Sequence, residues 1–290
     1  MKGSGVALVT PFNYDYTIDF DALGNLVEHC IAGGLNYLVV LGTTGEVPTL
    51  TKEEKKEVYE FVAKKVNKRV PLVAGIGGNN TSELIQTLQS FDIEGYDAIL
   101  SVSPYYNKPN QEGIYLHYME LARFSPLPII VYNVPGRTGA GISADTTLRL
   151  AAANHKFIAT KEASGNPEIF MDILINKPEQ FAVISGDDNL TVPFLAMGMS
   201  GVISVIGQAY PQLFSKMVNA GLAGDFTTAR EIHYKLYDLM KTIFADGSPG
   251  GIKVILEQMG LCKNVVRLPL APVNEQVKQK LIQLHKALQN

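Results

Sequence analysis

Lys161 is the strongest candidate for chemistry in this chain. It closes the segment Phe157-Ile-Ala-Thr-Lys161, a short apolar run that turns abruptly charged, and Glu162 follows it. Burial at the end of a strand disfavours the ammonium form, so we expect a neutral amine that can act as a nucleophile. Two alternatives remain open from this segment: the side chain extends to the rim of the fold, or it pairs with Glu162.

Hydroxyl groups, an arginine and a glycine-rich turn follow other apolar runs. Gly42-Thr-Thr-Gly-Glu46 offers two hydroxyls and several backbone N–H groups, which suit a carboxylate, although an ordinary turn has the same composition. Tyr132 could relay protons if its hydroxyl meets another hydroxyl, or it could be a core tyrosine. Arg137 could hold a carboxylate at two points, whereas a solvent-exposed loop arginine is the default.

Nucleotide and metal chemistry are not supported by spacing. Gly139-Ala-Gly-Ile-Ser-Ala144 matches a loose dinucleotide pattern, but it does not start at a strand end. Asp187-Asp188 could bind a cation, yet no two histidines have metal-ligand spacing, so turn capping suits this pair better. We predict no metal. A buried lysine with a tyrosine, threonines and an arginine instead indicates imine chemistry on a carbonyl substrate, as in a class I aldolase.

Eight apolar runs separated by helical patterns would position these residues. Continuous apolar strands that alternate with helices are typical of a parallel sheet covered on both faces. Eight such units predict an α/β fold, the (β/α)8 TIM barrel, with its active site at the carboxyl ends of the strands. The predicted strands are Val6–Thr10, Tyr37–Leu41, Leu72–Ala74, Ala98–Val102, Ile129–Val134, Phe157–Lys161, Ala182–Ser185 and Val202–Val205.

The strand signal stops near Phe226. Helical patterns continue to the C-terminus, interrupted by the Ser248–Gly251 turn and by Leu268-Pro-Leu-Ala-Pro272. We therefore predict a catalytic barrel over residues 1–225 and a helical region over 226–290. Helix starts are marked at Thr51-Lys-Glu-Glu54 and Asn80-Thr-Ser-Glu83.

Composition indicates an ordinary globular protein. Of the 290 residues, 46% are hydrophobic and 18% charged, and the net charge of -3 gives no reason to expect nucleic acid or an anionic membrane as partner. The two cysteines, Cys30 and Cys262, form no disulfide framework, which fits a reducing compartment. We find no signal-peptide or membrane-spanning pattern, so we expect a cytoplasmic location.

Several motifs together resemble the dihydrodipicolinate synthase family over nearly the whole chain. This family lies within the wider group of pyruvate-dependent aldolases that includes N-acetylneuraminate lyase. The matching segments are Gly42–Glu46, Ser103-Pro-Tyr-Tyr106, Tyr132-Asn-Val-Pro135 with Arg137-Thr138, Lys161-Glu162, and Ser185-Gly-Asp-Asp188.

The resemblance implies condensation of pyruvate with L-aspartate 4-semialdehyde to 4-hydroxy-tetrahydrodipicolinate, in lysine and diaminopimelate biosynthesis. It implies that Lys161 forms a Schiff base with pyruvate and that Thr43 and Thr44 hold the pyruvate carboxylate. Tyr132, Thr43 and Tyr106 correspond to the family's proton relay, with Tyr106 reaching in from a neighbouring subunit of a homotetramer built from two dimers. No external cofactor is implied.

The resemblance also places Arg137 on the semialdehyde carboxylate, and Gly186 and the Ile203 main chain at the same cavity. Another pyruvate aldolase, such as N-acetylneuraminate lyase, and a non-catalytic barrel that binds a keto acid are the alternative functions.

Residues that match the family's regulatory lysine cleft are Asn79, Glu83 and Tyr105. Lysine-sensitive members often carry histidines at the positions of Lys52 and Lys55. We therefore expect weak or absent inhibition by lysine, since two cations would repel its ammonium group.

Overall fold

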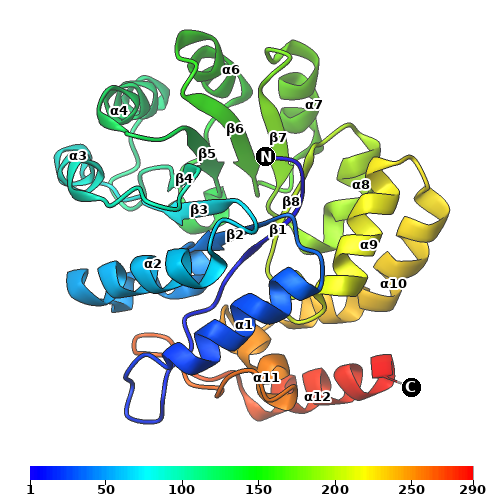
Figure 1. Cartoon of the computed structure of the whole chain (residues 1–290). Coiled ribbons are helices and arrows are strands. Elements are labelled where there is room, and N and C mark those ends of the chain that lie inside the picture. Colours follow the sequence, from blue (N-terminus) through cyan, green and yellow to red (C-terminus); the bar gives the residue numbers. More distant parts are fainter. Residues whose placement is uncertain (290) are drawn as a thin grey trace.

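A closed barrel of eight parallel strands forms the centre of the molecule (Figure 1). This computed structural model describes residues 1–289. Each strand pairs with the next in sequence, and β8 closes the ring on β1, so the predicted (β/α)8 barrel is confirmed. The strands are β1 Gly3–Ala7, β2 Tyr37–Val40, β3 Leu72–Gly75, β4 Ala98–Val102, β5 Ile129–Asn133, β6 Phe157–Glu162, β7 Ala182–Ser185 and β8 Gly201–Ser204.

β1 begins at Gly3 instead of the predicted Val6, and it ends at Ala7 instead of Thr10. Sequence reasoning missed this start because glycine has low strand propensity. The glycine at position 5 has a packing reason: a Cβ there would lie 2.1 Å from the Tyr37 ring, which is buried inside the barrel. Beyond Ala7, the Leu8 N–H still donates to the Val39 carbonyl at 3.0 Å, and the Thr10 hydroxyl donates to the Gly45 carbonyl at 2.7 Å.

Helices surround the strands, as Figure 1 shows. Thr51 and Glu54 form the predicted capping box, since each side chain accepts a hydrogen bond from the other's backbone N–H. Asn80 caps the next helix by accepting from the Glu83 N–H. The helices are α1 Phe20–Ala32, α2 Lys52–Val66, α3 Thr81–Ser90, α4 Gln111–Phe124, α5 Pro135–Thr138, α6 Ala144–Ala153, α7 Pro167–Asn176, α8 Thr191–Ala196 and α9 Pro211–Leu222.

Short 3₁₀ turns follow several strands. They are η1 Thr43–Gly45, η2 Val47–Thr49, η3 Asp188–Leu190 and η4 Ile206–Gln208. Three of them, η1, η3 and η4, come within a few residues of the carboxyl ends of β2, β7 and β8. Backbone and side chains from these turns therefore meet at one end of the barrel.

The strands bury side chains on both faces. The larger core lies between strands and helices, whereas a second apolar cluster fills the barrel interior. Inward residues alternate with outward ones along each strand, as strand geometry requires. The inner cluster consists of Ala7, Tyr37, Val39, Val73, Ala98, Leu100, Ile130, Tyr132, Val134, Ala159, Ile184 and Ile203.

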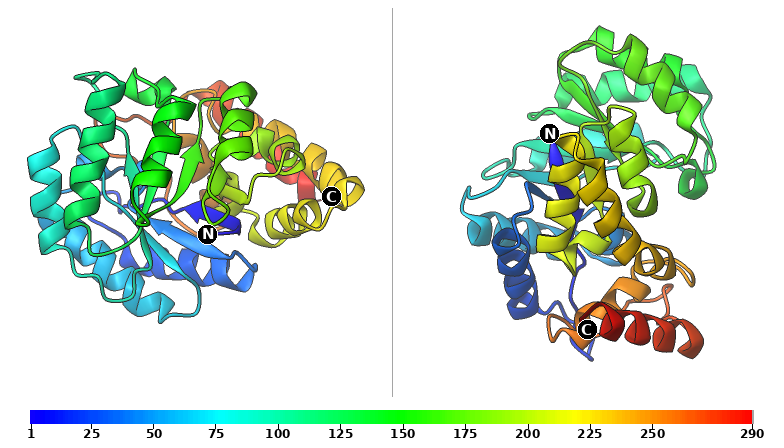
Figure 2. Two further views of the ribbon diagram at one scale, coloured as in Figure 1. Left: turned by 90° about the horizontal axis from the view of Figure 1, so that it is seen from above. Right: turned by 90° about the vertical axis from the view of Figure 1, so that its right-hand side faces the viewer.

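Three helices make up the C-terminal region: α10 Phe226–Thr242, α11 Gly250–Gln258 and α12 Glu275–Gln289. α10 packs along α9 and also contacts α12, which in turn packs on α11 (Figure 2). The predicted helical content is confirmed, while the domain boundary at residue 225 stays a prediction. No helix within residues 1–289 combines the length and the apolar character needed to cross a bilayer.

Candidate active site

Tyr132 and Lys161 lie side by side on adjacent strands. They are register partners of β5 and β6, and both are only 6% exposed. The Lys161 Nζ lies 4.3 Å from the centroid of the Tyr132 ring, which belongs to the inner cluster. The amine therefore points into the barrel and not into bulk water.

The next pair of register partners, Asn133 and Glu162, faces the opposite side of the barrel wall. The Asn133 amide donates to Glu162 Oε2 at 2.9 Å, and the Thr160 hydroxyl donates to Oε1 at 3.1 Å. Burial raises the pKa of Glu162 to about 8, although these two hydrogen bonds act to lower it. No ion pair joins Lys161 to Glu162 among the described residues, which excludes the pairing left open above.

The turn after β2 has two N–H groups that no residue in 1–289 uses. Backbone bonds run from the Gly45 N–H to Gly42 O at 2.9 Å and from the Glu46 N–H to Thr43 O at 3.3 Å. The N–H groups of Thr43 and Thr44 have no hydrogen-bond acceptor among residues 1–289. Glu46 adopts the left-handed conformation at φ 56°, which costs a non-glycine residue about 1–2 kcal/mol. Such a turn can bind an anion if its surroundings hold it in place.

Gly186 gives the Lys161 side chain its space. A Cβ at this position would lie 3.0 Å from Lys161 Cε and 2.6 Å from the Ala163 Cβ. Ile203 lies in the inner cluster at 1% exposure. Of the two predicted binding residues, Gly186 thus lies next to Lys161, and Ile203 lies in the same barrel interior as Tyr132.

A cavity of about 880 Å³ opens at the barrel mouth, and Thr43, Tyr132 and Arg137 line it. Lys161 does not line the cavity. Its Nζ contacts the ring of Tyr132, and Tyr132 does line it. The cavity continues to the predicted regulatory residues Asn79, Glu83 and Tyr105, together with Lys52 and Lys55. Thr43, Tyr132 and Arg137 therefore border the same space as the regulatory candidates.

Tyr106 is not brought into this site by its own chain. Its side chain is 89% exposed, and its backbone has a φ of 72°, in the left-handed region. A large aromatic side chain that is this exposed contributes nothing to the core of its own barrel. The predicted contribution of Tyr106 to a neighbouring subunit stays a prediction.

The turn-capping role predicted for the two aspartates after β7 is confirmed for Asp188. Asp188 Oδ2 accepts from the N–H groups of Val205 at 3.0 Å and Ile206 at 2.9 Å, so it caps the turn after β8. Burial raises the pKa of Asp187 to about 6, and the nearby Lys161 acts in the opposite direction. Asp187 is therefore electrostatically coupled to Lys161, which their separation of 26 positions in sequence did not reveal.

Comparisons with known proteins decide the family. The family model for the dihydrodipicolinate synthetase family matches residues 1–288. The chain belongs to this family. A 4-hydroxy-tetrahydrodipicolinate synthase from Parabacteroides distasonis is 51% identical over 98% of this chain and 97% of its own length. The resemblance inferred from the motifs is thereby confirmed.

Solved structures agree with this assignment. The dihydrodipicolinate synthase from Aquifex aeolicus matches with a TM-score of 0.96 and 41% identity, over 100% of this chain and 98% of that one. The chloride-inhibited enzyme from Acinetobacter baumannii, solved in complex with pyruvate, has a TM-score of 0.96 and 38% identity, over 99% of both chains. The chain is an enzyme of a family that acts on small molecules.

The raised pKa of Glu162 predicts a pH-dependent stability. Between its ordinary pKa of 4.5 and the folded value of about 8, the folded state holds a proton that the unfolded state has released. The free energy of unfolding therefore falls as pH rises through this window. Gln at this position stays neutral. Its amide oxygen can accept from Asn133, and its NH2 group can donate to the Thr160 hydroxyl oxygen, so Glu162→Gln is expected to lose that decline.

Urea unfolding of native protein and variant at pH 4.5 and pH 8 measures this effect, with the exposed Glu179→Gln as control. We expect Glu162→Gln to gain stability relative to the native protein on going to pH 8, and the control to show no such gain. A stability difference that is the same at both pH values would contradict the assignment.

Proposed function

We propose that this enzyme condenses pyruvate with L-aspartate 4-semialdehyde to 4-hydroxy-tetrahydrodipicolinate, in lysine and diaminopimelate biosynthesis. The observation that carries the proposal is the buried Lys161 amine against the Tyr132 ring, inside a barrel of the dihydrodipicolinate synthetase family. A cytoplasmic location follows as part of the same proposal.

In the proposed reaction the Lys161 amine attacks the ketone carbon of pyruvate, and water leaves as the Schiff base forms. The protonated imine then withdraws electrons, so that the pyruvate methyl carbon loses a proton and becomes a nucleophile. This carbon adds to the aldehyde of the second substrate, whose oxygen takes up a proton and becomes the 4-hydroxyl group. The amino group of the same substrate then replaces the Lys161 nitrogen at the imine carbon, which closes the ring and releases the free lysine. Burial of Lys161 supports the first step because an enclosed amine meets the ketone without competing bulk water.

The turn after β2 is the proposed site for the pyruvate carboxylate. The free N–H groups of Thr43 and Thr44 supply two donors, and the threonine hydroxyls can supply more. Gly186 supports the site by leaving room for the Lys161 stem, and the Ile203 main chain borders it. We assign Arg137, on the cavity wall, to the carboxylate of the semialdehyde.

Tyr132, Thr43 and Tyr106 form the proposed proton relay. Tyr132 and Thr43 share the wall of one cavity, whereas Tyr106 of the same chain is exposed. We propose that Tyr106 completes the relay in the partner subunit of a dimer, and that two such dimers form the tetramer. An exposed aromatic side chain on a left-handed backbone supports this assignment, since a partner surface would bury it.

Borohydride trapping tests the covalent step. With pyruvate and borohydride, the native enzyme is expected to gain a reduced pyruvate adduct on the peptide that contains Lys161, as measured by mass spectrometry. Lys161→Arg should give no adduct because a guanidinium forms no imine under these conditions. Tyr132→Phe should still give the adduct, with turnover slowed roughly 10²-fold or more by loss of the relay hydroxyl.

An unmodified native enzyme would support a barrel that only binds a keto acid, and would end the proposal. Full turnover in Tyr132→Phe would show that the relay is misassigned. Cleavage of a sialic acid with no condensation of aspartate semialdehyde would favour the N-acetylneuraminate lyase activity instead.

Hybrid oligomers test Tyr106. Lys161→Arg chains and Tyr106→Phe chains are each expected to be nearly inactive on their own. In a mixed dimer, the Lys161→Arg chain supplies an intact Tyr106 to the site of the Tyr106→Phe chain, which has an intact Lys161. Random co-assembly makes half of the dimers mixed and restores one of their two sites, so about a quarter of the native activity should return. No recovery in verified mixed dimers would place Tyr106 outside the partner's site.

The regulatory candidates lead to a prediction for lysine. Asn79 donates to the Tyr105 carbonyl at 3.0 Å, and both residues share the cavity wall with Glu83 and with Lys52 and Lys55. Burial lowers the pKa of Lys55, whereas the Glu83 carboxylate acts to raise it, so Glu83 already has a cation beside it. We propose that this leaves little attraction for the ammonium groups of lysine.

Initial rates with added lysine should therefore stay unchanged through the submillimolar range. A double variant, Lys52→His with Lys55→His, is expected to be inhibited at lower lysine concentrations than the native enzyme at pH 8. Submillimolar inhibition of the native enzyme would contradict the prediction.

A further inference from the structure

A buried ion pair ties the C-terminal region to the turn after β2. Glu46 closes that turn, and Lys253 belongs to α11. The Lys253 Nζ lies 2.6 Å from Glu46 Oε1, and both side chains are 0% exposed. An ion pair removed from water this completely is expensive to form, so its placement beside a candidate substrate site calls for a reason.

All three protons of the Lys253 ammonium have acceptors. Besides Glu46, the Nζ donates to the Thr10 carbonyl at 2.8 Å and to the Val265 carbonyl at 2.7 Å. The Thr10 hydroxyl in turn donates to the Gly45 carbonyl at 2.7 Å. Lys253 therefore holds the turn twice, directly at Glu46 and indirectly at Gly45.

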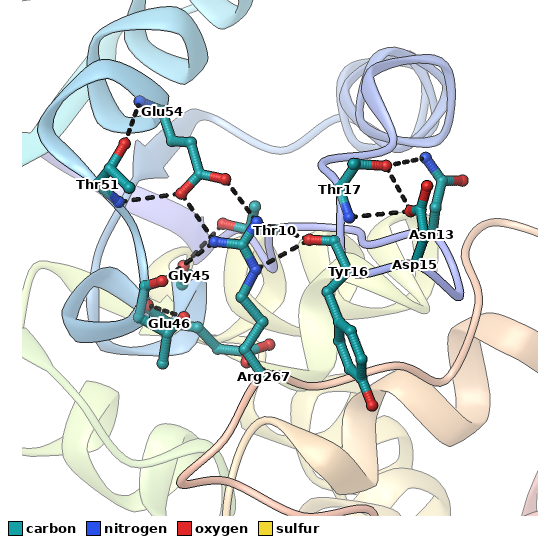
Figure 3. A network of polar contacts seen from close by, with 11 residues as sticks. Thr10, Asn13, Asp15, Tyr16, Thr17, Gly45, Glu46, Thr51, Glu54 and Arg267 are labelled. Carbon is teal, nitrogen blue, oxygen red and sulfur yellow. Dashed lines mark hydrogen bonds and ion pairs between the residues drawn. The ribbon is translucent and has the colours of Figure 1, made fainter.

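The second carboxylate oxygen of Glu46 is held as well. It accepts from the backbone N–H of Arg267 at 3.0 Å, and the Arg267 guanidinium binds Glu54 and the carbonyl groups of Tyr16 and Thr49. Figure 3 shows this guanidinium between Glu54 and Tyr16, with Glu46 nearby. The Glu46 carboxylate is thus fixed from two separate points of the C-terminal region.

The conformation of Glu46 explains why such fixing matters. Its backbone is left-handed, and its N–H donates to the Thr43 carbonyl, so the orientation of Thr43 depends on where Glu46 is held. A non-glycine residue keeps this conformation only when its surroundings determine it. If the N–H groups of Thr43 and Thr44 are already held in place, a carboxylate binds to them without the entropic cost of ordering the turn.

We propose that Lys253 is a positioning residue for the keto-acid carboxylate: through Glu46 and Thr10 it holds the Gly42–Glu46 turn in the shape that presents the Thr43 and Thr44 N–H groups. The inference rests on the proposed function, because it assigns this turn to pyruvate. It goes beyond that function by making the C-terminal region part of substrate recognition.

Trapping at Lys161 over a range of ketone concentrations tests the proposal. In Lys253→Met, the concentration of pyruvate that gives half-maximal adduct is expected to rise at least about tenfold, which corresponds to about 1.4 kcal/mol of lost binding. Methyl pyruvate carries a neutral ester in place of the carboxylate. Its half-maximal concentration should change much less, since only the carboxylate uses the turn.

Lys263→Met is the matched control. Lys263 lies in the same region and makes an equally short ion pair, 2.6 Å to Asp19, with a further bond to Asn13, but it does not touch the turn. We expect native half-maximal concentrations for both ketones in this variant. The double variant Glu46→Gln with Lys253→Met leaves no unpaired buried charge, and it decides the question if Lys253→Met does not fold.

Circular dichroism and thermal melting establish that each variant is folded. Native pyruvate dependence in folded Lys253→Met, or in the folded double variant, would overturn the inference. Equal losses for pyruvate and methyl pyruvate would overturn it too, because they would indicate a general loosening of the barrel mouth. Absence of any adduct in the native enzyme would instead refute the proposed function itself.

Discussion

The pairing of β5 with β6 is the constraint on which the candidate site depends. It puts Tyr132 beside Lys161 on the inside of the barrel and Asn133 beside Glu162 on the outside. Side chains alternate with a period of two, so a slip of β6 by one residue would turn Lys161 outward and Glu162 inward. The amine would then enter the outer core and the carboxyl group would enter the cavity. The roles proposed for the other candidate residues all require that Lys161 faces inward.

The second constraint is electrostatic and joins distant parts of the chain. Lys253, Lys263 and Arg267 all reach from the C-terminal region to carboxylates near the barrel mouth. Removing one partner of a fully buried pair such as Lys253 and Glu46 typically costs about 3–5 kcal/mol, because the other charge stays buried. The C-terminal region therefore does more than cover the barrel, since Lys253 and Arg267 hold Glu46 and Thr49, which line the cavity.

Much of the fold could be predicted from apolar runs, because strands buried on both faces are nearly continuous in hydrophobic residues. β1 was misplaced because Gly3 and Gly5 carry no such signal. Lys161 stood out where an apolar run became charged, yet adjacency to Glu162 suggested a pairing that strand alternation forbids. The contact between Glu46 and Lys253 spans 207 positions and follows no period, so only the folded chain reveals it.

The carboxyl groups near Lys161 differ in charge because their surroundings differ. Glu162, with a pKa raised to about 8 by burial, is mostly protonated at neutral pH and adds little negative charge behind the barrel wall. Asp187, with a pKa raised only to about 6, is mostly ionised and is coupled to Lys161. Asp188, in the same turn, interacts with Lys161 as well. Because Glu162 lies on the other side of the barrel wall, the negative charge that acts on a cation at Lys161 comes from the turn after β7 and not from the neighbouring residue in sequence.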